Sequence, residues 1–147
     1  YMDLRCRTEE KMRRLFIGAG GCPERFAPHY FVLGESRWFR GLADDMQVLV
    51  LPLEDLPVQT TSFTYPDSFT AMGLAPEYGL PYERRPYHEQ VFLLHELDEV
   101  ISEYGLPEDI EGGYDGYVQR PFEQYIEVQL WSDEPVARWL PGAPGPR

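Results

Sequence analysis

The sequence predicts a single α+β domain, with a mixed or antiparallel sheet of about five or more short strands, two short helices and long loops. Three observations support this prediction. The chain has 147 residues, of which 43% are hydrophobic and 14% aromatic, which is enough for one folded core. Short apolar or alternating runs outnumber segments with helical periodicity. Fourteen prolines and thirteen glycines divide the chain into short elements, so long helices are not expected.

Two helices are expected. The first begins at Thr8, whose hydroxyl suits an N-cap and is followed by acidic residues, and ends at Gly18. The second ends at Gly105. Its apolar residues recur at the spacing of one helix face: Leu97, Val100, Ile101 and Tyr104.

Strands are expected where short apolar or alternating runs end near glycine or proline. They cover residues 29–33, 47–51, 60–65, 90–94 and 125–131. Their apolar positions are expected to be largely buried: Val48, Val50, Phe92, Leu94, Ile126, Val128 and Leu130. Turn-rich loops are expected at 73–87 and 105–121. The domain is expected to cover residues 1–140, followed by a loose Pro/Gly tail at 141–147.

Charge is distributed unevenly along the chain, whose formal net charge is −12. Residues 1–40 carry eight basic against five acidic residues, whereas residues 41–147 carry five basic against twenty acidic ones. Twelve of the thirteen basic residues are arginine, which suits phosphate or carboxylate binding, although genome composition is the more common explanation. An acidic chain repels nucleic acid, so nucleic acid is not favoured as a partner.

No apolar run is long enough for a transmembrane helix, and the first residues lack the apolar stretch of a secretory signal. We therefore expect a soluble, cytoplasmic protein with no membrane partner. Cys6 and Cys22 could form one disulfide, but reduced cysteines are more common in that compartment. No metal site is expected, because no histidine lies at metal spacing from the cysteines, and His88 and His95 flank a predicted strand.

The glycine-rich segment 17–21, Ile-Gly-Ala-Gly-Gly, superficially resembles a dinucleotide-binding loop. Such a loop needs a preceding strand, a following helix and a third glycine. Here a predicted helix precedes the segment and Cys22-Pro23 follows it. The segment is therefore predicted to be the end of a helix and a turn.

Ser68 lies in the segment Pro66-Asp67-Ser68 and lacks the Gly-x-Ser-x-Gly surroundings of a nucleophilic serine. Asp67 and Ser68 are predicted to form a turn in which their side chains bond nearby backbone.

The last predicted strand carries the strongest functional signal. One of its faces is formed by alternate residues: Tyr125, Glu127, Gln129 and Trp131. The other face is apolar. A carboxylate between two aromatic residues could point into a cleft, bond a ribose hydroxyl and stabilise positive charge at an anomeric carbon. An outward-facing strand with a polar surface explains the same pattern and is the more common situation.

Arg37 follows the first predicted strand, in the segment Gly34-Glu35-Ser36-Arg37-Trp38-Phe39. Between a turn serine and a tryptophan, its guanidinium group could hold a pyrophosphate. It could equally stack on Trp38 as a surface pair.

Four segments then occur in order: Pro28-His29-Tyr30-Phe31, Ser36-Arg37-Trp38, the strand from Met46 to Leu53, and Phe63-Thr64-Tyr65 with its turn. In this order they resemble the opening half of the DNA-modifying ADP-ribosyltransferase toxins. In that family an arginine after the first strand binds NAD, and a glutamate on a late strand is catalytic. The family's N-terminal histidine motif has no counterpart here, and Arg5 is the nearest basic residue.

The resemblance implies a mono-ADP-ribosyltransferase-like domain that binds NAD as a substrate and transfers ADP-ribose to an unidentified acceptor. By position it implies Glu127 as the catalytic residue and Arg37 as the residue on the phosphates. It implies Arg5 as a substitute binding residue, and Tyr30 or Tyr125 as the residue stacked on nicotinamide. The acidity beyond residue 41 does not suit a DNA acceptor.

The alternative is a non-enzymatic interaction domain of the immunity or inhibitor type. Its acidic and aromatic surface would cover a basic protein partner. The two interpretations differ in one structural requirement, because only the enzyme needs Arg37 and Glu127 to face the same cleft.

Overall fold

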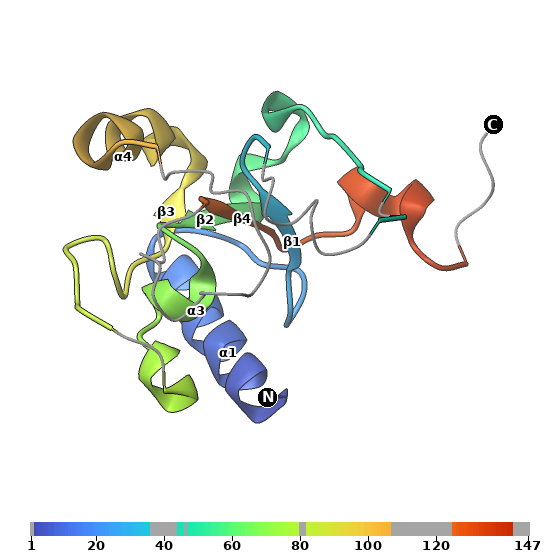
Figure 1. Cartoon of the computed structure of the whole chain (residues 1–147). Helices are drawn as coiled ribbons and strands as arrows, with labels where there is room; N and C mark the ends of the chain where they lie inside the picture. The colour runs from blue at the N-terminus through green and yellow to red at the C-terminus, as the bar shows by residue number, and fades with distance from the viewer. Residues whose placement is uncertain (1, 36–43, 46, 80–81, 107–124, 143–147) are drawn as a thin grey trace.

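The computed structural model describes residues 2–35, 44–45, 47–79, 82–106 and 125–142, which form an α+β domain (Figure 1). The helices and strands are α1 (Met2–Gly18), β1 (His29–Val32), β2 (Thr61–Thr64), α3 (Ser68–Ala71), β3 (Phe92–Leu93), α4 (Leu97–Tyr104) and β4 (Glu127–Leu130). Short 3-10 turns occur at Leu53–Asp55, Val58–Thr60, Ala75–Tyr78, Leu94–Glu96 and Glu134–Trp139. The α+β prediction is confirmed, with four strands in these ranges rather than five or more. No helix within them is long and apolar enough to cross a membrane.

The strands form one antiparallel sheet in the order β1–β4–β2–β3. β4 is central because it pairs with β1 on one side and with β2 on the other. Glu127, the first residue of β4, lies opposite Val32 of β1 and Thr64 of β2. The last residues of β1 and β2 and the first residue of β4 therefore meet at one end of the sheet. We call this the Glu127 end (Val32, Thr64 and Glu127).

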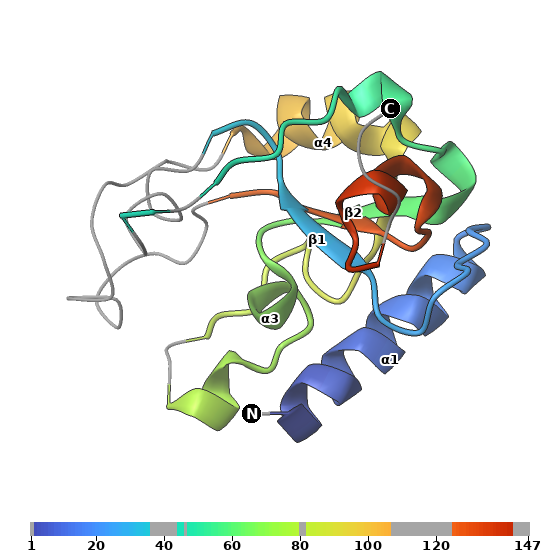
Figure 2. The same ribbon diagram turned by 90° about the vertical axis from the view of Figure 1, so that its right-hand side faces the viewer.

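Helices cover both faces of the sheet, with α4 on one side and α1 and α3 on the other (Figures 1 and 2). The α4 side holds the larger core cluster, which includes Phe63, Tyr65, Phe92, Leu97, Val100, Ile126, Val128 and Leu130. The α1 side holds a second cluster: Met12, Phe16, Ala71, Met72, Val91 and Trp131. Every residue of β4 is buried as a result. The face that carries Glu127 is thus covered by helices, and the interpretation of it as a solvent-facing polar surface is wrong.

Helix α1 begins at Met2 rather than at Thr8. Thr8 is fully buried inside the helix, and its hydroxyl donates to the carbonyl oxygen of Leu4 at 2.8 Å instead of capping an N-terminus. The buried residues Thr8, Met12 and Phe16 recur at every fourth position, which gives α1 one face that packs on the sheet. The expectation of only short helices is wrong, because this packing stabilises a helix of 17 residues.

The glycine-rich segment ends helix α1, as predicted. The helix stops at Gly18, and the amide of Gly21 donates to the carbonyl oxygen of Phe16 at 2.9 Å. A Cβ atom on Gly21 would overlap the ring of Phe16, so glycine allows the chain to turn closely against the helix.

Residues 47–51 do not form the predicted buried strand. Val48 is 56% exposed and Val50 79% exposed, so the prediction that both are buried is wrong. Only Leu51, at the end of this run, packs against the core cluster on the α4 side. In the described sheet β4, rather than a strand following β1 in the chain, pairs with both β1 and β2. Such non-local pairing cannot be inferred from apolar character alone.

The other expected core positions on the strands are confirmed, with one exception. Phe92, Ile126, Val128 and Leu130 are buried. Leu94 is only half-buried because β3 stops at Leu93 and a 3-10 turn follows. Helix α4 ends before Gly105 as predicted, and the φ of 83° at Gly105 suits glycine.

A matched pair of substitutions tests this packing. Ile126→Ala is expected to lower the free energy of unfolding by about 2–5 kcal/mol, because Ile126 is 1% exposed in the core. Val50→Ala is expected to change it by less than about 0.5 kcal/mol, because its side chain faces solvent. Urea unfolding followed by circular dichroism measures both. Equal effects of the two substitutions would contradict the described positions.

Candidate functional site

The structure describes four of the five predicted site residues, whereas Arg37 lies outside the described residues. Arg5 is on α1, Tyr30 on β1 and Glu127 on β4. These three lie on the α1 side of the sheet, since Tyr30 pairs with Gln129 in register and packs with the cluster on that side. Tyr125 precedes β4 and is half-buried.

Arg5 and Tyr30 are in direct contact. The guanidinium carbon of Arg5 lies 4.0 Å from the centre of the Tyr30 ring and 5.1 Å from that of Phe69. Its Nε lies 3.5 Å from Oε1 of Glu9, which also accepts a hydrogen bond of 2.8 Å from the Tyr30 hydroxyl. Burial raises the pKa of Tyr30 far above its ordinary value, so this hydroxyl stays protonated. One face of the Tyr30 ring is therefore occupied by Arg5.

Glu127 is 6% exposed and lies at one end of a buried hydrogen-bond chain. Nε2 of Gln129 donates to Oε1 of Glu127 and to Oγ1 of Thr64, both at 3.0 Å. Ser62 Oγ donates to Gln129 Oε1 at 2.8 Å, and Trp131 Nε1 donates to Ser62 Oγ at 2.9 Å. The sheet register places these side chains on one face, so the network holds the Glu127 carboxyl in a fixed position.

Asp67 and Ser68 lie beside Glu127 at the start of α3. The predicted bonding of Asp67 to local backbone is confirmed, because Oδ1 accepts from the amide of Thr70 at 3.1 Å and Oδ2 from its hydroxyl at 2.8 Å. Ser68 is fully buried and close enough to lower the pKa of Glu127. Its hydroxyl makes no hydrogen bond of normal geometry within the described residues, so the prediction that Ser68 bonds nearby backbone is wrong. A buried hydroxyl without such a bond is uncommon in folded proteins.

The carboxyl group of Glu127 is strongly perturbed. Burial, with the nearby carboxyl of Asp67 as the second cause, raises the pKa of Glu127 to about 7. Ser68, Gln129 and Arg5 act in the opposite direction. Asp67 as a residue is half-buried, but its carboxyl is enclosed, and this burial raises its pKa against the effect of the cap hydrogen bonds. Two neighbouring carboxyl groups thus both have a raised pKa, chiefly because burial removes them from water.

Stability is expected to fall as pH rises from about 4.5 to about 7 because of Glu127. In this window the folded state retains a proton that the unfolded state has released, so its favourable contribution is complete below about pH 4.5 and lost above about pH 7. The total change is roughly 3 kcal/mol. Urea unfolding from pH 4.5 to 8 should show this slope in the wild type and a smaller one in Glu127→Gln. An identical pH dependence in both proteins would contradict it.

Four of these residues were not predicted as site residues from the sequence: Glu9, Asp67, Ser68 and Gln129. Gln129 could have been found, because it is two positions from Glu127 on an alternating strand. Asp67 and Ser68 were recognised only as a turn. Their position beside Glu127 depends on the pairing of β2 with β4, which brings distant segments together.

No group of three or more His, Cys, Asp or Glu side chains is placed to hold a metal ion within the described ranges. Cys6 and Cys22 are both free and exposed. No protein-family model, no curated protein and no solved structure matches this chain. A functional conclusion therefore depends on the geometry of the site.

Proposed function

We propose that this chain is a mono-ADP-ribosyltransferase-like domain that binds NAD and uses the carboxylate of Glu127 to stabilise the transition state. The observation that carries the proposal is the environment of Glu127. A buried carboxyl with a pKa of about 7 lies beside the buried hydroxyl of Ser68 and close to the positive charge of Arg5. Perturbed carboxyl groups with convergent polar partners are typical of functional sites.

The chemistry requires a carboxylate at this position. When the glycosidic bond of NAD breaks, nicotinamide leaves with the bonding electron pair and positive charge develops on the ribose. An ionised Glu127 would stabilise that charge, and in a region of low dielectric the effect is larger than in water. The acceptor nucleophile then forms the new bond to the anomeric carbon.

In this proposal the side chains of Arg5 and Ser68 contact the substrate. Among the described residues Arg5 has Glu9 as its ion-pair partner, through Nε, which leaves the fork of the guanidinium group for a phosphate oxygen. Arg37 keeps its proposed role on the phosphates, and Tyr125 its role beside nicotinamide. Tyr30 is better suited to holding Arg5 than to stacking on nicotinamide, since Arg5 covers one face of its ring. The proposal includes a cytoplasmic location, where free thiols such as Cys6 persist.

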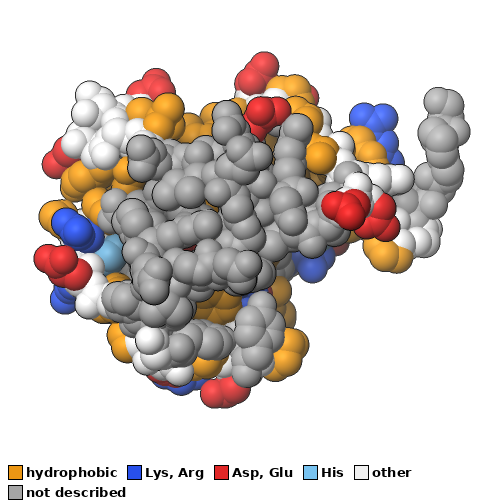
Figure 3. All heavy atoms as spheres, in the orientation of Figure 1, with side chains coloured by type: hydrophobic (Ala, Val, Ile, Leu, Met, Phe, Trp, Pro, Cys, Tyr) orange, Lys and Arg blue, Asp and Glu red, His pale blue; other side chains and the backbone are white. Residues whose placement is uncertain are grey.

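Titration calorimetry with NAD, followed by mass spectrometry of released nicotinamide, tests the proposal. Binding at or below millimolar NAD together with nicotinamide release is the expected result. If neither occurs, the enzyme proposal is wrong and the acidic interaction domain takes its place. Among the described side chains visible in Figure 3, acidic ones lie at several places around the rim of this face.

A further inference from the structure

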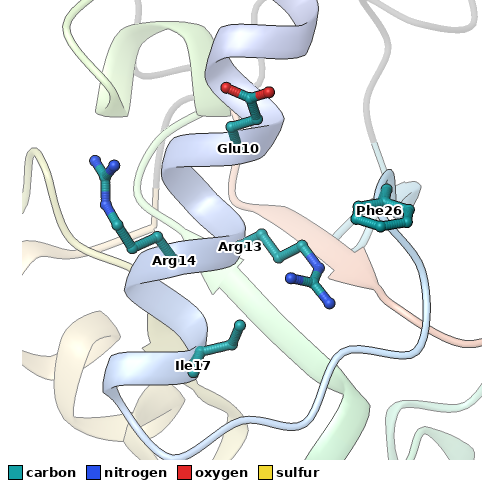
Figure 4. A pocket seen from close by; sticks show the side chains of 5 residues that line it. All are labelled: Glu10, Arg13, Arg14, Ile17 and Phe26. Atoms are coloured by element: carbon teal, nitrogen blue, oxygen red, sulfur yellow. The ribbon is translucent and has the colours of Figure 1, made fainter.

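The outer face of α1 forms a shallow, open groove of about 290 Å³ together with the chain that follows the helix. We call it the α1 groove and define it by its lining residues: Glu10, Arg13, Arg14, Ile17 and Phe26. Figure 4 shows the side chain of Arg13 directed towards Phe26, with Arg14 on the other side of the helix axis. The groove lies away from the Glu127 end, because the opposite face of α1 is the one that packs on the sheet.

The apolar side chains of the groove are large and exposed to solvent. Phe26 is 85% exposed and Ile17 is 47% exposed. The guanidinium carbon of Arg13 lies 5.1 Å from the centre of the Phe26 ring, and its Nε donates to the carbonyl oxygen of Arg25 at 3.2 Å. These contacts fix the position of Arg13 beside Phe26 and leave the ring accessible. Exposed apolar side chains with a polar rim are typical of interaction sites.

The basic residues of the groove differ from the other basic residues of α1 in their ion pairing. Three basic residues of the helix form ion pairs: Arg5 with Glu9, Arg7 with Glu77, and Lys11 with Glu89. Arg13 and Arg14 have no carboxylate partner in the part of the chain that the structure describes. In a chain of net charge −12, two neighbouring unpaired arginines form a local site for carboxylates.

The spacing of the lining residues indicates the shape of the partner. Glu10, Arg13, Arg14 and Ile17 follow the pattern i, i+3, i+4, i+7, so they form one stripe along the helix. A second helix can lie along such a stripe, with its side chains between those of α1. The net charge of −12 disfavours a phosphate backbone as the occupant.

We infer that the α1 groove is a docking surface for an amphipathic helix of a partner protein. The partner helix places apolar side chains on Ile17 and Phe26 and carboxylates on Arg13 and Arg14. The acidic remainder of the chain repels such a partner elsewhere, which restricts its binding to this groove. The inference uses residues other than those around Glu127, so it stands or fails independently of NAD binding.

The probe is a fluorescein-labelled helical peptide of about 16 residues, with leucine and tryptophan along one stripe and glutamates on either side. Fluorescence anisotropy is expected to show a Kd on the order of 10–100 µM at low salt, weakening as salt rises. The double variant Arg13→Gln/Arg14→Gln is expected to weaken binding about tenfold, and Phe26→Ala about fivefold. The matched control is Arg138→Gln, which removes a cation that lies over an exposed tryptophan ring elsewhere and should leave the affinity unchanged.

Circular dichroism confirms that each variant is folded, which is expected because these side chains do not fill the core. Undetectable binding at low salt, equal binding by all variants, or equal binding of a peptide with lysine in place of glutamate would overturn the inference. Binding of single-stranded DNA that the double variant loses would also overturn it, in favour of nucleic acid. A wild-type dimer in sedimentation equilibrium that becomes monomeric in the double variant would identify the occupant as a second copy of this chain, and this too would overturn it.

Discussion

Glu127→Gln is expected to reduce nicotinamide release by about 10²-fold or more while leaving the affinity for NAD nearly unchanged. Glutamine keeps the shape of the side chain and can still accept the hydrogen bond from Gln129. It removes the negative charge, which is needed only when positive charge develops on the ribose. The rate of the unmodified protein is expected to rise with pH through a midpoint near 7, because only the ionised carboxyl is effective.

The controls separate a catalytic effect from a binding effect. Glu99→Gln removes an exposed carboxylate on α4 and is expected to leave both rate and affinity unchanged. Arg37→Ala is expected to weaken NAD binding by a few-fold or more, in line with roughly 1.5–3 kcal/mol for a charged hydrogen bond. If Glu127→Gln retains full activity, the carboxyl of Glu127 is not the stabilising group, even if NAD is bound and cleaved.

Trp131→Ala is expected to lower the free energy of unfolding by about 3–5 kcal/mol. Trp131 is fully buried and stacks on Phe16 of α1, with 6.1 Å between ring centres. Its Nε1 also donates to Ser62, at one end of the hydrogen-bond chain that leads to Glu127. The substitution leaves a cavity between α1 and the sheet and removes one bond of this chain.

Trp139→Ala is the matched control, because Trp139 is 46% exposed in the final 3-10 turn. It is expected to change the free energy of unfolding by less than about 0.5 kcal/mol. Chemical denaturation measures both variants. A loss for Trp131→Ala as small as that for Trp139→Ala would show that α1 does not pack on Trp131 as described.

Local sequence patterns predicted the elements that are determined by residues close together in the chain. Helix α4 was found from four apolar residues on one helix face and the glycine that follows them. β4 was found from strict alternation, and β2 from a β-rich run bounded by a Pro-Asp turn. The end of α1 was found because Gly18 stops the helix. In each case the residues that determine the element lie within a few positions of one another.

Patterns failed where distant packing decides the outcome. Residues 47–51 are as apolar as a buried strand, but β1 and β2 pair with the distant β4, and Val48 and Val50 are exposed. Thr8 has the sequence signature of an N-cap. It nevertheless lies inside α1. Met12 and Phe16 pack the helix on the sheet, and the residues before Thr8 extend the helix back to Met2.

The candidate site also has one part that the sequence predicts and another that depends on distant packing. The sequence by itself determined that Glu127 and Gln129 share a strand face, because a period of two is a local property of any strand. Only the tertiary structure decided what lies over that face. Antiparallel pairing of β4 with β1 and β2, and the packing of α1 and α3 on the sheet, brought Arg5, Asp67 and Ser68 to the same carboxyl group. The raised pKa of Glu127 follows from this enclosure, since desolvation depends on the surrounding fold and not on neighbouring residues in the chain.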